Sequence, residues 1–235
     1  MTISTLRREV AKLRQEANRK TETAPTLLAA IRKDPAALMT QAGLQPDPWQ
    51  ARLLRAGDSR TLLLCSRQAG KSTAAAALAL AEALSRGNTL VLLLSPTLRQ
   101  SGELFRKVMA LYRALKRPVP AEQESALSVE LSNGSRVVSL PGSEATIRGY
   151  SGVRLLVIDE AARVPDDLYF AVRPMLATTR GRLVCLSTAF ARQGWFFKAW
   201  TGAQKWQRVD FFSIECSGTR GYLAATRRQM KSHWR

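Results

Sequence analysis

One nine-residue segment, Cys65 to Thr73, narrows the possible folds of this chain to a few. It reads Cys-Ser-Arg-Gln-Ala-Gly-Lys-Ser-Thr, and it lies between a short apolar run, Thr61 to Leu64, and an alanine-rich stretch, Thr73 to Arg86. The apolar run is typical of a buried strand, and the alanine-rich stretch is typical of a helix. A strand, a glycine-containing loop and a helix in this order predict an α/β fold with a phosphate-binding loop.

The same segment predicts how a nucleotide such as ATP would be held. Backbone N–H groups of the loop would point at the phosphates, Lys71 would reach the β- and γ-phosphates, and the Ser72 hydroxyl would bind Mg²⁺. Cys65 stands where the pattern usually has its first glycine, so a glycine turn that opens an ordinary helix stays an alternative. The cofactor-binding candidates of the loop are Ser66, Arg67, Gln68, Ala69, Gly70, Lys71, Ser72 and Thr73.

A second motif, Leu155 to Glu160, reads Leu-Leu-Val-Ile-Asp-Glu. Its four apolar residues predict a strand buried on both faces, and two carboxylates end it. Asp159 is the candidate metal ligand, and Glu160 is the candidate for polarising an attacking water. An alternative is that the two acids cap a following helix. The order of the two motifs, each at the carboxyl end of an apolar strand, favours a nucleotide site.

The charge of the chain points to a polyanionic partner. With 36 basic and 18 acidic residues the net charge is +18, and half of it lies in residues 161–235. Such a field attracts phosphate backbones, although a solvated basic surface is the alternative. No apolar run has the length of a membrane span and no signal core is seen, so we expect a cytoplasmic protein without a membrane partner. His233 is the single histidine, which excludes a histidine-based triad.

Five residues are candidates by their place along the chain. Gln50, shortly before the phosphate loop and next to Trp49, is a candidate for binding adenine, because an amide both donates and accepts. Arg148, in a glycine-containing loop, and Arg67, in the phosphate loop, are rival candidates for stabilising transition-state charge. A pair of hydroxyl residues at the end of an apolar strand could couple hydrolysis to movement, or could only satisfy backbone groups; these are Ser187 and Thr188.

Periodicity and turn signals predict the other elements. An Asn-Gly pair at 133–134 predicts a β-hairpin, which we expect to be an insertion on the α/β core. The hairpin strands are predicted at 127–131 and 135–140, and the remaining predicted strands are 89–95, 183–187 and 206–212. The remaining predicted helices are 2–20, one that starts at Pro25, 35–43, 104–116, 165–173 and 194–200.

Five segments together resemble the ATPase domain of the large terminase subunit of tailed bacteriophages. They match that family in order and spacing between about Leu44 and Phe212, and they are Ser66 to Ser72, Ser95 to Ser101, Ile147 to Gly152, Ile158 to Ala162 and Leu186 to Thr188.

The resemblance implies a RecA-like additional-strand P-loop ATPase, with a mostly parallel sheet flanked by helices. It divides the chain into a helical N-terminal extension (1–43), the ATPase domain (44–212) and a basic C-terminal tail (213–235). It implies an ATP- and Mg²⁺-dependent motor that packages double-stranded DNA into a procapsid, as a homo-oligomeric ring on a phage portal. A small terminase subunit is a further candidate partner.

The resemblance also assigns roles to residues. It assigns adenine binding to Gln50 and water activation to Glu160. It assigns the coupling of hydrolysis to movement to Ser187 and Thr188, and it makes Arg148 rather than Arg67 the trans-acting arginine. After Glu160, however, the chain has too few carboxylates for the family's nuclease, so we expect no DNA cleavage. Two alternative functions stay open: a helicase-like DNA translocase, and a prophage remnant that binds nucleotide and DNA without turnover.

Overall fold

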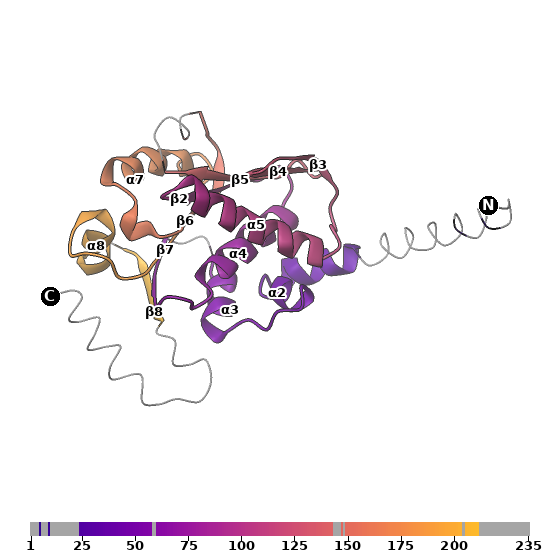
Figure 1. The fold of residues 1–235 in the computed structure, drawn as a ribbon, viewed down its shortest axis with the longest axis horizontal. Helices are drawn as coiled ribbons and strands as arrows, with labels where there is room; N and C mark the ends of the chain where they lie inside the picture. Colours follow the sequence, from indigo (N-terminus) through magenta and orange to yellow (C-terminus); the bar gives the residue numbers. More distant parts are fainter. Residues whose placement is uncertain are drawn as a thin grey trace.

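An eight-stranded sheet forms the centre of the computed structural model, which describes residues 24–57, 60–142, 147, 149–203 and 205–211, with Thr5 and Glu9 (Figure 1). The strand order is β3-β4-β5-β2-β6-β7-β1-β8. The strands from β5 to β8 in this order run parallel, and β3 and β4 form an antiparallel edge. Their bounds are β1 Arg60–Cys65, β2 Leu90–Ser95, β3 Ala121–Glu124, β4 Ser128–Leu131, β5 Arg136–Pro141, β6 Val153–Ile158, β7 Arg182–Ser187 and β8 Gln207–Phe211.

The strand order confirms the predicted fold class. Strand β7 lies between β1, which leads into the phosphate loop, and β6, which carries the two acids. An additional strand therefore separates the two motif-bearing strands, and parallel neighbours bring their carboxyl ends to one edge of the sheet.

Helices cover both faces of the sheet (Figure 1). Along β1, Leu63 packs into the core on one face and Leu62 into the core on the other, as the two-residue repeat of a strand requires. Each face is therefore apolar, which explains why the parallel strands are continuous apolar runs. One face carries the helix over residues 24–33, α2 Ala37–Gln41, α3 Pro48–Arg55, α4 Lys71–Ser85 and α5 Leu98–Ala114; the other carries the 3₁₀ turns η1 Ala161–Arg163 and η2 Arg173–Leu176, with α7 Asp166–Val172 and α8 Gly194–Thr201.

Helix α4 lies against the sheet through its alanines. Ala74 to Ala77 are each 0% exposed, and they belong to the core that also contains Leu63 and Leu93. Alanine favours the helix and its small side chain allows a close approach to the strands. The start of α4 is thereby held directly behind the carboxyl end of β1.

The hairpin forms as predicted, but its second strand belongs to the central sheet. Strand β5 pairs with β2 in parallel, and Val137 to Leu140 are buried. The hairpin thus extends the sheet rather than projecting from it. Helix α5 begins earlier than predicted, because the Thr97 hydroxyl accepts a hydrogen bond from the Gln100 N–H over 3.3 Å and caps the helix there. Strand β3 was not predicted.

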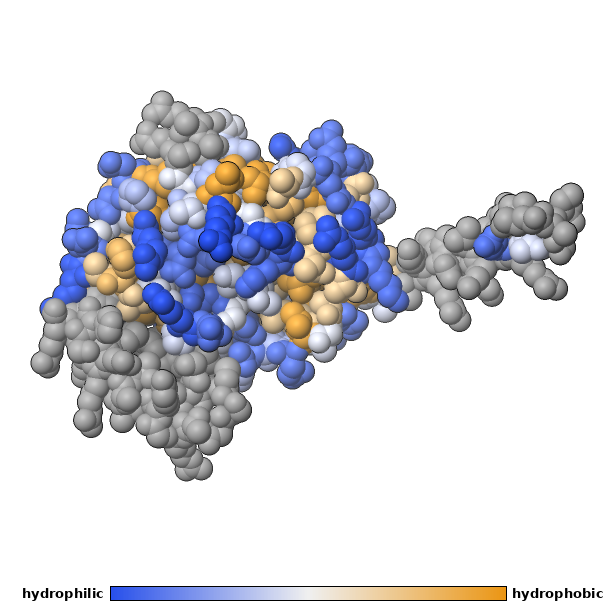
Figure 2. Space-filling view, viewed as in Figure 1, coloured by the Kyte–Doolittle hydropathy of each residue, from blue (hydrophilic) through white to orange (hydrophobic). Residues whose placement is uncertain are grey.

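Residues 24–43 pack on the same core as α4, with Ile31 and Leu38 fully buried. The predicted helix 2–20, apart from Thr5 and Glu9, and the tail 213–235 lie outside the described residues. Figure 2 shows a mainly hydrophilic face with scattered hydrophobic patches. Within the part of the chain that the structure describes, no helix is both long and apolar enough to cross a membrane.

Candidate active site

The loops that follow β1, β6 and β7 meet at the carboxyl edge of the sheet, where they enclose a cavity of about 370 Å³. Helix α5 adds two side chains to its wall. The lining residues are Arg67, Gln68, Ala69, Gly70, Lys71, Ser72, Gln100, Lys107, Glu160, Arg163 and Thr188.

Gly70 gives the phosphate loop its bend into α4. Its φ of +78° is in the left-handed region, and a Cβ at this position would lie 2.6 Å from Nε2 of Gln50. Because of these two features, any residue other than glycine at this position would force the loop or the Gln50 side chain to rearrange. Gln50 is 5% exposed, its Oε1 accepts from the Asp47 N–H over 2.9 Å, and its Nε2 lies 3.5 Å from the Gly70 carbonyl. Gln50 therefore supports the loop from behind and does not line the cavity.

Lys71 and Ser72 open α4 and are held in place by hydrogen bonds. The Lys71 ammonium donates to the Ser66 carbonyl over 3.0 Å, and this side chain is 7% exposed. The Ser72 hydroxyl donates to Oδ2 of Asp159 over 3.0 Å, although the two residues are 87 positions apart in the chain. The fold thus brings the two sequence motifs into direct contact.

The paired carboxylates after β6 lie in different environments. Burial raises the pKa of the Asp159 carboxyl above its usual range; the Glu160 charge adds to this effect, and the Ser72 hydrogen bond and Lys71 oppose it. An arriving cation would relieve this cost of ionisation. Glu160 has a φ of +49°, and its N–H donates to Oδ1 of Asp159 over 3.0 Å. A non-glycine residue in the left-handed region is a local strain of the kind found at functional sites.

The end of β7 contacts Glu160 directly. The Thr188 hydroxyl donates to Oε2 of Glu160 over 3.2 Å. The Ser187 hydroxyl accepts from the Ala162 N–H over 3.1 Å and donates to the Thr188 carbonyl over 2.8 Å. The two hydroxyls of the predicted coupling pair therefore join the end of β7 to the loop after β6.

The oxygen ligands present fit a magnesium ion. The Ser72 hydroxyl and an Asp159 carboxylate oxygen are in contact at the cavity edge, and hard oxygen ligands are those that Mg²⁺ prefers. No group of three or more His, Cys, Asp or Glu side chains among the described residues could hold a metal ion alone. The donor set thus suits an ion that completes its coordination with substrate phosphates and waters.

Most of the predicted site residues come together, and their roles stay predictions. Arg67, Gln68, Ala69, Gly70, Lys71, Ser72, Glu160 and Thr188 line one cavity, with Ser66, Thr73, Asp159 and Ser187 in the adjoining segments. Arg148 lies outside the described residues.

Two basic residues of the cavity were not predicted. Arg163 has its Nε 3.9 Å from Oε2 of Glu160, and its guanidinium lies 4.3 Å from the ring centre of Phe190. Lys107 is seven residues after Gln100 on α5, which places both on one helix face. That spacing, and the three-residue step from Glu160 to Arg163, are the sequence signals that could have identified them.

Residues 62–228 match the family model described as "Terminase large subunit, T4likevirus-type, N-terminal". Among curated proteins, the terminase large subunit of Thermus virus P23-45 is 26% identical over 69% of this chain and 38% of its own length. The relative from Thermus phage G20c gives the same identity and coverage. The chain therefore spans less than two fifths of the curated relatives it matches.

Solved structures show the same fold. The large terminase ATPase domain of Thermus phage P74-26 superposes with a TM-score of 0.65 at 20% identity, over 83% of this chain and 87% of that one. The large terminase of another thermophilic bacteriophage gives 0.54 at 18% identity, over 78% and 50%. The N-terminal domain of the DNA packaging ATPase from bacteriophage phi29 gives 0.53 at 12% identity, over 74% and 98%.

Proposed function

The chain belongs to the family of terminase large subunits, and from this we propose that it is an ATP-hydrolysing motor for packaging double-stranded viral DNA. The observation that carries the proposal is the pair of contacts between distant segments, Ser72 to Asp159 and Thr188 to Glu160, around one cavity. They join the phosphate loop, the candidate metal ligand, the candidate base and a neighbouring strand. Solved structures of a thermophilic bacteriophage large terminase with ATP-γ-S and with ADP support a nucleotide as the ligand.

In the proposed reaction a water attacks the γ-phosphate of ATP in line with the leaving oxygen. Glu160 polarises this water, and Lys71 leaves its resting contact with the Ser66 carbonyl to bind phosphate oxygens. Ser72 and Asp159 would hold Mg²⁺, which when bound neutralises charge on the β- and γ-phosphates. The backbone N–H groups from Ala69 onward and the start of α4 stabilise the remaining charge.

The contact between Thr188 and Glu160 supports the coupling role of the hydroxyl pair. Any change in the hydrogen bonding of Glu160 during hydrolysis reaches the end of β7 through a single hydrogen bond. Ser187 passes the same change to Ala162, because its hydroxyl binds that backbone N–H. The two hydroxyls therefore link the state of the nucleotide to the segments after β6 and β7.

We also propose that a neighbouring subunit completes the site. Arg148 is the proposed trans-acting arginine of a homo-oligomeric ring on a phage portal, with a small terminase subunit as a further partner. Arg67 is exposed and lines the cavity, which supports it as the candidate acting within its own subunit. Gln50 stays our proposal for adenine, and this role would require its amide to exchange its contacts with Asp47 and Gly70 for the base.

No nuclease activity is proposed for this chain. Asp166, one of the few acids after Glu160, accepts from the Trp195 N–H over 2.7 Å and lies 3.8 Å from Lys198, so it serves the packing of α8. Incubation of plasmid DNA with Mn²⁺ tests this expectation, and cleavage by the purified chain contradicts it.

The experiment that tests the motor is ATP hydrolysis measured against protein concentration, with and without duplex DNA. Lys71→Ala should abolish turnover in a folded protein, and Arg148→Ala should abolish the rise of specific activity with concentration. The exposed Arg113→Ala on α5 is the matched control. Turnover that survives in Lys71→Ala sinks the proposal, and activity that is independent of concentration and of Arg148 removes the trans-acting arginine.

A further inference from the structure

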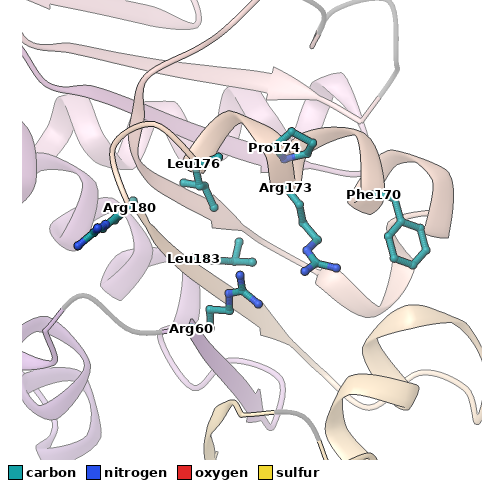
Figure 3. A pocket seen from close by; sticks show the side chains of 9 residues that line it. Arg60, Phe170, Arg173, Pro174, Leu176, Arg180 and Leu183 are labelled. Atoms are coloured by element: carbon teal, nitrogen blue, oxygen red, sulfur yellow. The ribbon is translucent and has the colours of Figure 1, made fainter.

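A second cavity, of about 640 Å³, lies at the opposite end of the sheet (Figure 3). It is bordered by the amino ends of β1 and β7 and by η2. A six-residue strand is roughly 20 Å long, so a ligand here would be about that far from the nucleotide cavity. The lining residues are Arg60, Phe170, Arg173, Pro174, Leu176, Ala177, Arg180, Gly181 and Leu183.

Three arginines bring uncompensated charge to this cavity. Arg60 begins β1, Arg173 begins η2 and Arg180 lies in the turn before β7. None of the ion pairs between described residues includes any of the three. A guanidinium stays protonated at any physiological pH, so the positive field here is permanent and attracts an anion.

The side chains are arranged for more than one anionic group. In Figure 3, Arg60 and Arg173 extend toward one another past Leu183, and Arg180 points away from them on the other side of the cavity. Arg173 also lies over the Tyr169 ring, 5.6 Å from its centre, which holds its direction. Two converging guanidiniums suit one phosphate, and Arg180 suits a neighbouring one along a chain.

Each polar side chain among the described lining residues is an arginine. Among the lining residues that the structure describes, there is no Asn, Gln, Asp, Glu, Ser or Thr, the residue types that read base edges together with arginine. Contacts from arginine to phosphate hold a nucleic acid by its backbone and carry no sequence information. A packaging motor has to accept DNA of any sequence, and this lining meets that need.

We propose that these three residues, called here the arginine pocket (Arg60, Arg173 and Arg180), bind successive phosphates of one strand of duplex DNA. The identity of the polyanion rests on the proposed function. The location does not, because it follows from the unpaired charges and the geometry of the cavity. DNA held here leaves the nucleotide cavity open at the other end of the sheet.

Salt-dependent binding tests the arginine pocket. Fluorescence anisotropy with a labelled duplex measures the affinity of the full chain, and the slope of log K against log salt counts the phosphates neutralised. In the triple variant Arg60→Gln, Arg173→Gln, Arg180→Gln we expect this slope to fall by about 2 and the affinity at 0.1 M salt to fall by roughly 30- to 100-fold. Arg113→Gln, an exposed arginine away from the cavity, is the charge-matched control for one substitution.

A second pair of variants adds charge without removing any packing. Ala177 lines the cavity and is exposed, so Ala177→Glu places a carboxylate at its mouth and Ala177→Gln is its nearly isosteric neutral counterpart. We expect Ala177→Glu to weaken DNA binding at least several-fold relative to Ala177→Gln. Equal salt slopes in the wild type and the triple variant, or equal affinities in the Ala177 pair, overturn the assignment.

The same variants separate this inference from the proposed motor function. Basal ATP hydrolysis without DNA should match the wild type in every one of them, because no residue of the arginine pocket lines the nucleotide cavity. A wild-type chain that binds DNA through the arginine pocket but never hydrolyses ATP would refute the motor and leave the DNA site standing.

Discussion

The two ends of the sheet differ in whether their charged groups have partners within the protein. At the carboxyl end, Ser72 and Glu160 each have a hydrogen-bond partner from another segment, Lys71 has one within the phosphate loop, and Glu160 shares its cavity with basic residues. At the amino end, the arginine pocket has no carboxylate partner among the described residues. Groups tied to one another are fixed before a substrate arrives, which suits chemistry. Charge without a partner in the protein attracts an anionic ligand, which suits binding.

This difference would separate the two proposed functions, ATP hydrolysis and DNA binding, along the strands. The carboxyl end needs side chains from distant parts of the chain in one geometry, and β1, β6 and β7 supply them. The amino end needs only several positive charges close together on a rigid surface. The buried side chains of Leu176 and Leu183 form that surface. Disruption of a single contact should therefore harm the first end far more than the second.

Glu160→Gln gives the largest expected effect. The amide keeps the size of the carboxylate but cannot take up the charge of a polarised water, so we expect kcat to fall by about 10²- to 10⁴-fold. Phosphate release measures the loss, and binding of a fluorescent ATP analogue and of duplex DNA should both persist. Hydrolysis within tenfold of the wild type would show that another group polarises the water.

Thr188→Val tests the contact between β7 and Glu160. The valine keeps the shape but removes the donor to a charged oxygen, a bond worth about 1.5–3 kcal/mol, so we expect roughly a tenfold or greater fall in kcat. The KM for ATP should change little. Thr188→Ser keeps the hydroxyl and should retain activity, and an unchanged kcat in the valine variant would disprove the coupling contact.

Gly70→Ala tests how tightly the phosphate loop is packed. We expect a loss of about 1–2 kcal/mol of unfolding free energy from the left-handed backbone alone, with more from the close approach to Gln50. In a Gln50→Ala background only the backbone part should remain. Chemical denaturation of the four proteins measures the coupling, and strictly additive losses would contradict the contact.

The smallest expected effect is at Cys185, which lies in β7 between the two ends of the sheet and which we expect not to react in the native protein. It is 0% exposed, and burial raises the pKa of its thiol well above the usual range, so the reactive thiolate is not formed at mildly alkaline pH. We expect no alkylation by iodoacetamide in the native protein, and full reaction in urea, by mass spectrometry. Modification of native Cys185 would show that the sheet opens between its ends.

Much of the fold could be predicted because apolar strands and motif loops leave local signals. The runs ending at Cys65, Ile158 and Ser187 became the parallel strands that hold the candidate site. The place of β5 in the sheet could not be predicted, because pairing with β2 is decided by distant packing rather than by the hairpin sequence.

The same limit applies to the sites. The phosphate loop and the two acids follow a pattern within short segments, but Lys107 enters the cavity through the tertiary position of α5. The arginine pocket draws on three separate segments, none of which is unusual in a chain of this charge. Only the folded arrangement distinguishes these arginines from the other basic residues.

The alanine surface of α4 has a mechanical consequence. Since Ala74 to Ala77 have no rotatable side chain and are in full contact with their surroundings, α4 and the strands beneath it form one stiff block that resists sliding. In the proposed motor, a force that arises at the γ-phosphate of bound ATP would then pass through α4 to the sheet without deforming the helix. We expect the stroke of such a motor to arise where Thr188 and Glu160 meet, outside this block.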